Sequence, residues 1–193
     1  LAGSSDSEVA TPPLPFVAQE LEQIQGLYDG ALLINEQFDR EAFTREITDR
    51  QPNVVHIASH AYFDETPEHS YLATHTDKLG FDDLRHAIGT SKFRRPLELL
   101  TLSACDTAAG SSKAALGLAG VAIRAGARSA VGTLWRVSDQ ASSELIVAFY
   151  RELKNEDSGK AQALAQAQRA MATDQQFSHP YYWSGFLMIN NWL

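Results

Sequence analysis

The chain alternates between two hydrophobic patterns, one with the period of a helix and one made of continuous apolar runs. Apolar residues recur every three or four positions in five segments that predict helices: 16–28, 38–50, 81–89, 139–153 and 159–173. Short runs rich in apolar and β-branched residues predict five buried strands: 31–35, 53–61, 97–104, 128–135 and 181–192. Helices that alternate with strands whose two faces are both apolar predict an α/β fold, with a mostly parallel central sheet and helices on both of its faces.

Several residues predict where these elements begin, turn or end. Asp39 and Ser138 directly precede helical patterns and are expected to act as N-caps, and Gly89 is expected to end its helix. The segment 70–81 predicts a hairpin that turns around Thr76 and Asp77. The small residues of 114–127 predict a further helix that packs closely against a flat surface.

The first 15 residues differ in character from the rest. They are polar and small, and they include Pro12, Pro13 and Pro15, so they predict a linker or the tail of a preceding module. Residues 16–193 would then form the main domain, for which the length is sufficient. Because the chain begins at Leu1, we expect it to be a piece of a longer protein.

Composition narrows the function classes. Hydrophobic residues make up 44% and charged residues 21%, as in an ordinary globular protein. The net charge of −8 argues against nucleic acid or an anionic membrane as a direct partner. A single cysteine, with no secretory signal and no uninterrupted transmembrane stretch, favours a reducing compartment such as the cytoplasm. No dinucleotide, phosphate-loop or metal-ligand spacing is present, so we predict no cofactor and no metal.

The only cysteine, Cys105, follows one predicted strand, and His60 follows another. Parallel strands bring their carboxyl ends to the same edge of a sheet, and neighbouring strands lie about 5 Å apart. A thiol becomes nucleophilic when a base such as histidine favours its thiolate. The alternative is that Cys105 is an inert buried side chain. His56 also competes with His60, but its place inside the strand predicts that it packs against the sheet.

Four segments in order resemble the motifs of one family: HIASHA, LELLTLSACDTAAG, ALGLAGVAIRAGARSAVGTLWRVSDQAS and HPYYWSGFLM. They are similar to those of the CHAT domain family, caspase- and separase-like cysteine peptidases that are often fused to tetratricopeptide repeats. The resemblance runs from about LPFVAQEL to the final NNWL. It implies a caspase-like fold, and the 45 residues from His60 to Cys105 compare with roughly 50 in caspases.

The resemblance also implies roles for individual residues. Cys105 would be the nucleophile and His60 the general base and acid, while the backbone N–H groups of Cys105 and Ala61 would form the oxyanion hole. Position 61 is commonly Gly in the family. Asp106 would either help to position the dyad or face solvent, and we favour solvent.

Three residues are expected to bind substrate. By analogy with caspase-like folds, Ser103 would help to line the primary pocket, and Trp135 and Asp139 would form another wall that favours a basic side chain. The alternative is that Trp135 is a core residue and that Asp139 is a first-turn carboxylate stabilised by the helix dipole.

The resulting hypothesis is a cysteine endopeptidase that cleaves a protein substrate through an acyl-enzyme thioester. Its activity would be regulated by a partner or by an attached module such as tetratricopeptide repeats. The second hypothesis is an inactive CHAT-like scaffold that binds proteins, and Ala61 is the residue that favours it.

Overall fold

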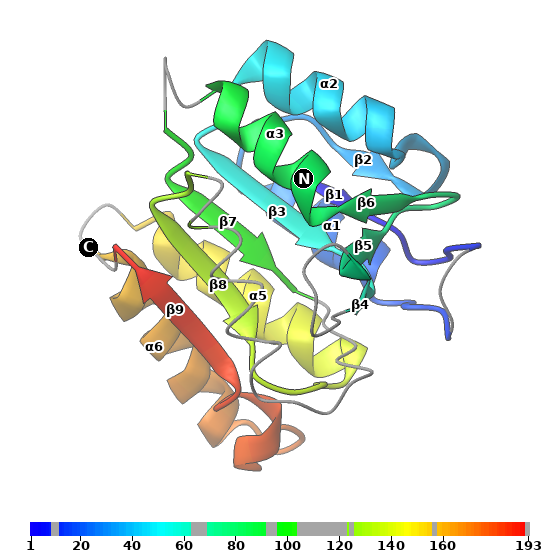
Figure 1. Ribbon diagram of the computed structural model, residues 1–193. Coiled ribbons are helices and arrows are strands. Elements are labelled where there is room, and N and C mark those ends of the chain that lie inside the picture. Colours follow the sequence, from blue (N-terminus) through cyan, green and yellow to red (C-terminus); the bar gives the residue numbers. More distant parts are fainter. Residues whose placement is uncertain are drawn as a thin grey trace.

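A six-stranded sheet forms the centre of the molecule, with strand order β2-β1-β3-β7-β8-β9 (Figure 1). The computed structural model describes residues 1–8, 12–62, 69–91, 96–103, 123, 126–155 and 158–191. The first five strands in this order run parallel, and β9 runs antiparallel to β8 at one edge. The strands are β1 (Ala2–Gly3), β2 (Leu33–Ile34), β3 (Val54–Ala58), β7 (Leu99–Leu102), β8 (Ser129–Thr133) and β9 (Phe186–Asn190).

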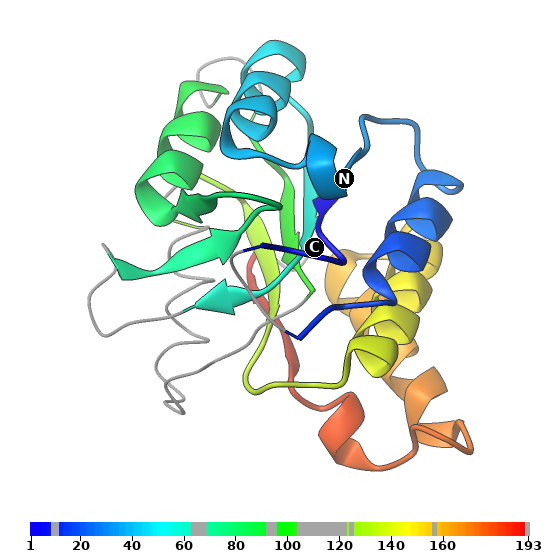
Figure 2. The ribbon, with the colours of Figure 1, turned by 90° about the vertical axis from the view of Figure 1, so that its right-hand side faces the viewer.

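Helices cover both faces of this sheet, as the view along its edge shows (Figure 2). One face carries α2 (Arg40–Arg50) and α3 (Phe81–Ser91). The opposite face carries α1 (Val17–Gln25), α5 (Asp139–Leu153) and α6 (Lys160–Thr173). The α/β fold class predicted from the alternation of helices and buried strands is therefore confirmed. Among the described helices, none is long and apolar enough to span a lipid bilayer.

Local sequence signals explain the helix starts. Asp39 accepts a hydrogen bond from the Ala42 N–H at 2.7 Å, and Ser138 accepts one from the Ala141 N–H at 3.2 Å, so both predicted N-caps are confirmed. The predicted stop at Gly89 is wrong, since α3 continues to Ser91. Gly89 does not take the positive φ that turns a chain out of a helix, so it remains a tolerated helical glycine.

A second, three-stranded antiparallel sheet follows β3 along the chain. It consists of β4 (Ala61–Tyr62), β5 (Tyr71–Ala73) and β6 (Lys78–Gly80), and β5 with β6 forms the predicted hairpin. β4 starts three residues after β3 ends, so the Ser59–His60 segment connects the central sheet to this smaller one.

The first residues of the chain belong to the central sheet, although the sequence predicted a linker over residues 1–15. Ala2 of β1 pairs with Leu33 on β2 and with Ile57 on β3. Gly3 is required here, because a Cβ atom would lie 2.4 Å from the Ala58 carbonyl oxygen. A strand of two residues is too short to produce a periodic pattern, so the composition of its surroundings dominated the prediction.

The hydrophobic core is divided by the sheet. On the α2 and α3 face, buried Phe38, Phe43 and Leu84 pack against the strands. On the opposite face, α5 supplies Leu145 and Phe149, which pack with the buried side of α6. This two-sided burial holds the parallel strands rigidly and sets the position of their carboxyl ends.

Candidate functional site

His60 lies immediately beyond the carboxyl end of β3 and is 8% exposed. Its carbonyl oxygen accepts a hydrogen bond from the Ala73 N–H on β5 at 2.9 Å, and the Ser59 hydroxyl donates to the Ala73 carbonyl. The His60 ring nitrogen Nε2 lies 2.7 Å from the Pro12 carbonyl oxygen. Because a carbonyl only accepts, Nε2 must carry the proton in this contact, which leaves Nδ1 of a neutral His60 as an acceptor.

The strand next to β3 is β7, so the arrangement predicted for the two carboxyl ends is confirmed at the level of the strands. Ile57 pairs with Leu102, and the Ser103 N–H donates to the Ile57 carbonyl at 3.0 Å. Figure 1 shows the two strands side by side with their arrowheads toward the same end. Cys105 follows Ser103 by two residues but lies outside the described residues, as do Asp106 and most of the predicted helix 114–127.

A buried polar cluster lies beneath this edge of the sheet. The Ser103 hydroxyl donates to Glu20 Oε1 at 2.6 Å, and His56 Nε2 lies 2.8 Å from the same oxygen. All three side chains are at most 1% exposed. His56 is fully buried within β3, which confirms that it packs in the core, and its ring meets the ring of Tyr150 on α5 edge-on at 5.4 Å.

Glu20 was not predicted from the sequence, although a signal for it existed. On α1 the buried residues Val17, Leu21 and Ile24 define one face, and Glu20 falls on that face, three residues after Val17. A carboxylate on the apolar side of an amphipathic helix needs a polar partner in the core. The partners are His56 of β3 and Ser103, the residue after β7, and no local pattern connects either of them to α1.

Ala61 lies in β4 and is 1% exposed. It is not among the described residues with positive φ, so its backbone does not need the conformational freedom of glycine. Alanine at this position is therefore compatible with the backbone that the structure adopts. The role of its N–H group in an oxyanion hole stays a prediction.

Trp135 packs against the segment that leads into β9. Its indole N–H donates to the Tyr181 carbonyl at 3.0 Å, and its ring stacks on the Tyr181 ring at 6.4 Å. A Cβ atom on Gly185 would lie 2.7 Å from the indole, so this glycine permits the contact. Among the described contacts none joins Trp135 to His60 or Ser103, and its substrate-binding role stays a prediction.

Asp139, the first residue of α5, connects this helix to the segment before α1. Its Oδ2 accepts a hydrogen bond from the Phe16 N–H at 2.8 Å. Burial raises the pKa of Asp139 above its usual value, and the nearby Glu20 carboxyl group adds to this rise. The hydrogen bond from the Phe16 N–H and the nearby His60 ring act in the opposite direction but do not cancel it. Asp139 is thus within electrostatic reach of both His60 and the Glu20 cluster.

Replacing Asp139 with asparagine is expected to raise the unfolding temperature more at about pH 7 than at about pH 3. A raised pKa means that the folded state binds the proton more tightly than the unfolded chain. The resulting stabilisation is complete below the unfolded pKa and is lost as the pH rises through the folded pKa. Asparagine stays neutral and still accepts from Phe16.

Thermal unfolding of the wild type and Asp139→Asn across this pH range measures the effect, with the exposed Asp29→Asn as control. If the gain in unfolding temperature of Asp139→Asn over the wild type becomes smaller as the pH rises, the charge on the Asp139 carboxylate stabilises the fold and the expectation is wrong.

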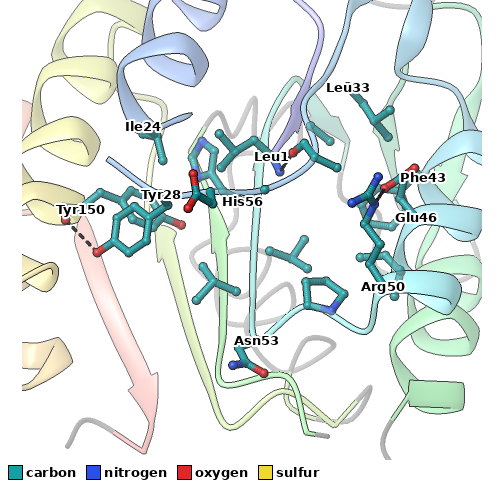
Figure 3. Close-up of a pocket in the computed structure, with 18 residues that line it drawn as sticks. Leu1, Ile24, Tyr28, Leu33, Phe43, Glu46, Arg50, Asn53, His56 and Tyr150 are labelled. Atoms are coloured by element: carbon teal, nitrogen blue, oxygen red, sulfur yellow. Dashed lines mark hydrogen bonds and ion pairs between the residues drawn. The ribbon is translucent and has the colours of Figure 1, made fainter. Parts of the chain in front are cut away.

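A cavity of about 470 Å³ lies at the other end of β3, away from His60 (Figure 3). It is lined by residues 53–56 of the chain, by Leu1 and by side chains of α1 and α2, and His56 and Tyr150 reach it. Within the described parts of the chain, no group of three or more His, Cys, Asp or Glu side chains is arranged to hold a metal ion. Of the predicted catalytic and substrate-binding residues that the structure describes, none lines this cavity.

The chain is similar to a known domain family and to part of a human protein. The sequence profile of the CHAT domain matches residues 2–191. A stretch of 69 residues is 38% identical to human tetratricopeptide repeat protein 28; it covers 36% of this chain and 3% of that much longer protein. The profile match includes β1 and β9, the first and last strands of the central sheet. With nearly its whole length matched, the chain belongs to the CHAT domain family.

Proposed function

We propose that this chain is a cysteine endopeptidase in which Cys105 and His60 form a catalytic dyad. CHAT domains are related to caspase-like cysteine peptidases. The observation that carries the proposal is the environment of His60: it is nearly buried at the carboxyl end of β3, and Nε2 is held by the Pro12 carbonyl. Nδ1 is then the nitrogen that exchanges a proton with a nucleophile arriving from the neighbouring strand.

The reaction follows from these groups. His60 Nδ1 takes the Cys105 thiol proton, and the thiolate attacks the scissile carbonyl carbon, which moves an electron pair onto the carbonyl oxygen. The N–H groups of Ala61 and Cys105 stabilise this oxyanion. The C–N bond breaks, His60 protonates the leaving amine, and a thioester remains. Water then gives a proton to His60 and attacks the thioester, which releases the acid and the thiol.

Substrate selection is assigned to Ser103, Trp135 and Asp139, as the sequence predicted. The Asp139 carboxylate is close enough to His60 to interact with it electrostatically, which supports a preference for a basic substrate side chain. The likeness to a tetratricopeptide repeat protein supports regulation by such a module, attached or separate. A reducing compartment such as the cytoplasm would keep the single thiol active.

The rate of alkylation of Cys105 by iodoacetamide tests the dyad directly, because the chain has one cysteine. In a dyad the thiolate persists at neutral pH, whereas an ordinary thiol with pKa of about 8.5 is largely protonated. We expect the wild type to react roughly tenfold faster than His60→Ala near pH 7, as measured by mass spectrometry. Equal rates would favour the alternative, a CHAT-like scaffold that binds proteins without hydrolysis.

A further inference from the structure

Glu20 on α1 contacts a residue from each of the two chain segments that lead to the proposed dyad. A single oxygen, Oε1, accepts the hydroxyl of Ser103, the residue after β7, and contacts the His56 imidazole of β3. These strands lead to Cys105 and to His60, respectively. One helix side chain therefore connects the two strands whose relative position determines whether thiol and imidazole meet.

The cluster brings polar groups into the core of the molecule. Glu20, His56 and Ser103 are each at most 1% exposed, and Glu20 Oε1 lies 2.6 Å from the Ser103 hydroxyl oxygen and 2.8 Å from His56 Nε2. Moving an ionisable side chain out of water costs free energy, and apolar residues of similar volume often stabilise a core as well as a buried polar network does. Stability alone therefore does not explain the arrangement.

The cluster fixes the positions of the chain segments that lead to the proposed dyad. The Ser103 N–H donates to the Ile57 carbonyl and the Ser103 hydroxyl donates to Glu20. These two bonds fix the chain where it leaves β7, two residues before Cys105. His56 is held between Glu20 and the edge of Tyr150, four residues before His60. Proton transfer between a thiol and an imidazole depends on separations controlled within a fraction of an ångström.

Glu20 also belongs to a segment that touches the site elsewhere. The same stretch of chain supplies the Pro12 carbonyl to His60 and the Phe16 N–H to Asp139. With the Glu20 contact to Ser103, this stretch makes three contacts, which lie at the ends of β3 and β7 and at the start of α5.

We propose that Glu20 is a positioning residue that, through Ser103 and His56, sets the geometry between Cys105 and His60. This inference rests on the proposed cysteine peptidase function. Glu20 touches neither substrate nor nucleophile in this role. One carboxyl oxygen must accept the Ser103 hydroxyl and face the His56 imidazole at once, and a carboxylate oxygen is a stronger hydrogen-bond acceptor than an amide oxygen.

The test compares Glu20→Gln, which keeps the shape and the acceptor oxygen, with Glu22→Gln on the exposed side of the same helix. The readout is the pH dependence of Cys105 alkylation by iodoacetamide, with thermal unfolding measured in parallel. Glu20→Gln is expected to react about tenfold more slowly near pH 7, with its profile moved toward that of an ordinary thiol. Glu22→Gln should match the wild type.

Ser103 provides a second variant in case Glu20→Gln folds poorly. Ser103→Ala removes the hydroxyl and should reproduce the slower alkylation and the moved pH profile, with Glu22→Gln again as the unchanged control. A lower unfolding temperature with an unchanged pH profile in Glu20→Gln and Ser103→Ala would show a structural role only, and would overturn the inference.

The two proposals fail in different ways. If the wild type and His60→Ala react equally, the dyad is absent, and the role of Glu20 falls with it. If His60→Ala is slow while both Glu20→Gln and Ser103→Ala keep the wild-type profile, only the positioning role falls.

Discussion

His60→Ala is expected to lower kcat/KM for peptide hydrolysis by about 10²- to 10⁴-fold, the contribution typical of a general acid–base group. In the proposed mechanism His60 removes the thiol proton, protonates the leaving amine and activates water. Its Nε2 contact with the Pro12 carbonyl holds the ring in one orientation throughout. Cys105→Ala should abolish hydrolysis, because no other cysteine is present in the chain.

A peptide library first identifies a sequence that the wild type cleaves, and the variants are then assayed on that sequence. His86→Ala, on the exposed side of α3, is the matched control and should keep wild-type kcat/KM. If His60→Ala retains more than about a tenth of the wild-type value, His60 is not the acid–base group, since its role alone is worth at least 10²-fold.

Phe186→Ala is expected to lower the free energy of unfolding by about 3–5 kcal/mol. Phe186 is 1% exposed and packs in the core on the α5 and α6 side of the sheet. Its truncation leaves a cavity where β9 joins β8. Urea unfolding measures the loss as a lower midpoint at an unchanged slope.

The next residue provides a control within the same strand. Leu187 points to the other side of β9 and is 36% exposed, so Leu187→Ala should cost no more than about 1 kcal/mol. Equal losses of unfolding free energy in the two variants would mean that burial of the Phe186 side chain does not determine the stability of this edge of the sheet.

Periodicity predicted the larger elements well because each one buries a face that is visible in its own residues. The apolar side of α2, capped by Asp39, and the apolar runs of β3 and β7 formed where expected. Elements that depend on partners were missed. β1 is two residues long, and it is a strand only because β2 and β3 lie on either side of it.

The candidate site also combines features that the sequence predicted with contacts that it did not. The sequence predicted that His60 follows one strand and that Cys105 follows another, and the structure makes these strands neighbours. It did not predict the Pro12 carbonyl on His60, because that group is backbone and lies 48 residues away. Nor did it predict the Glu20 contact with Ser103, which spans 83 residues.

By itself, the sequence determined the fold class, most helix and strand positions, and the two residue types needed for a thiol dyad, since each is set by residues close along the chain. Only the tertiary structure decided strand order, the tautomer of His60 and the partners of Glu20. These depend on groups that are distant in sequence and meet only when helices pack on both faces of the sheet.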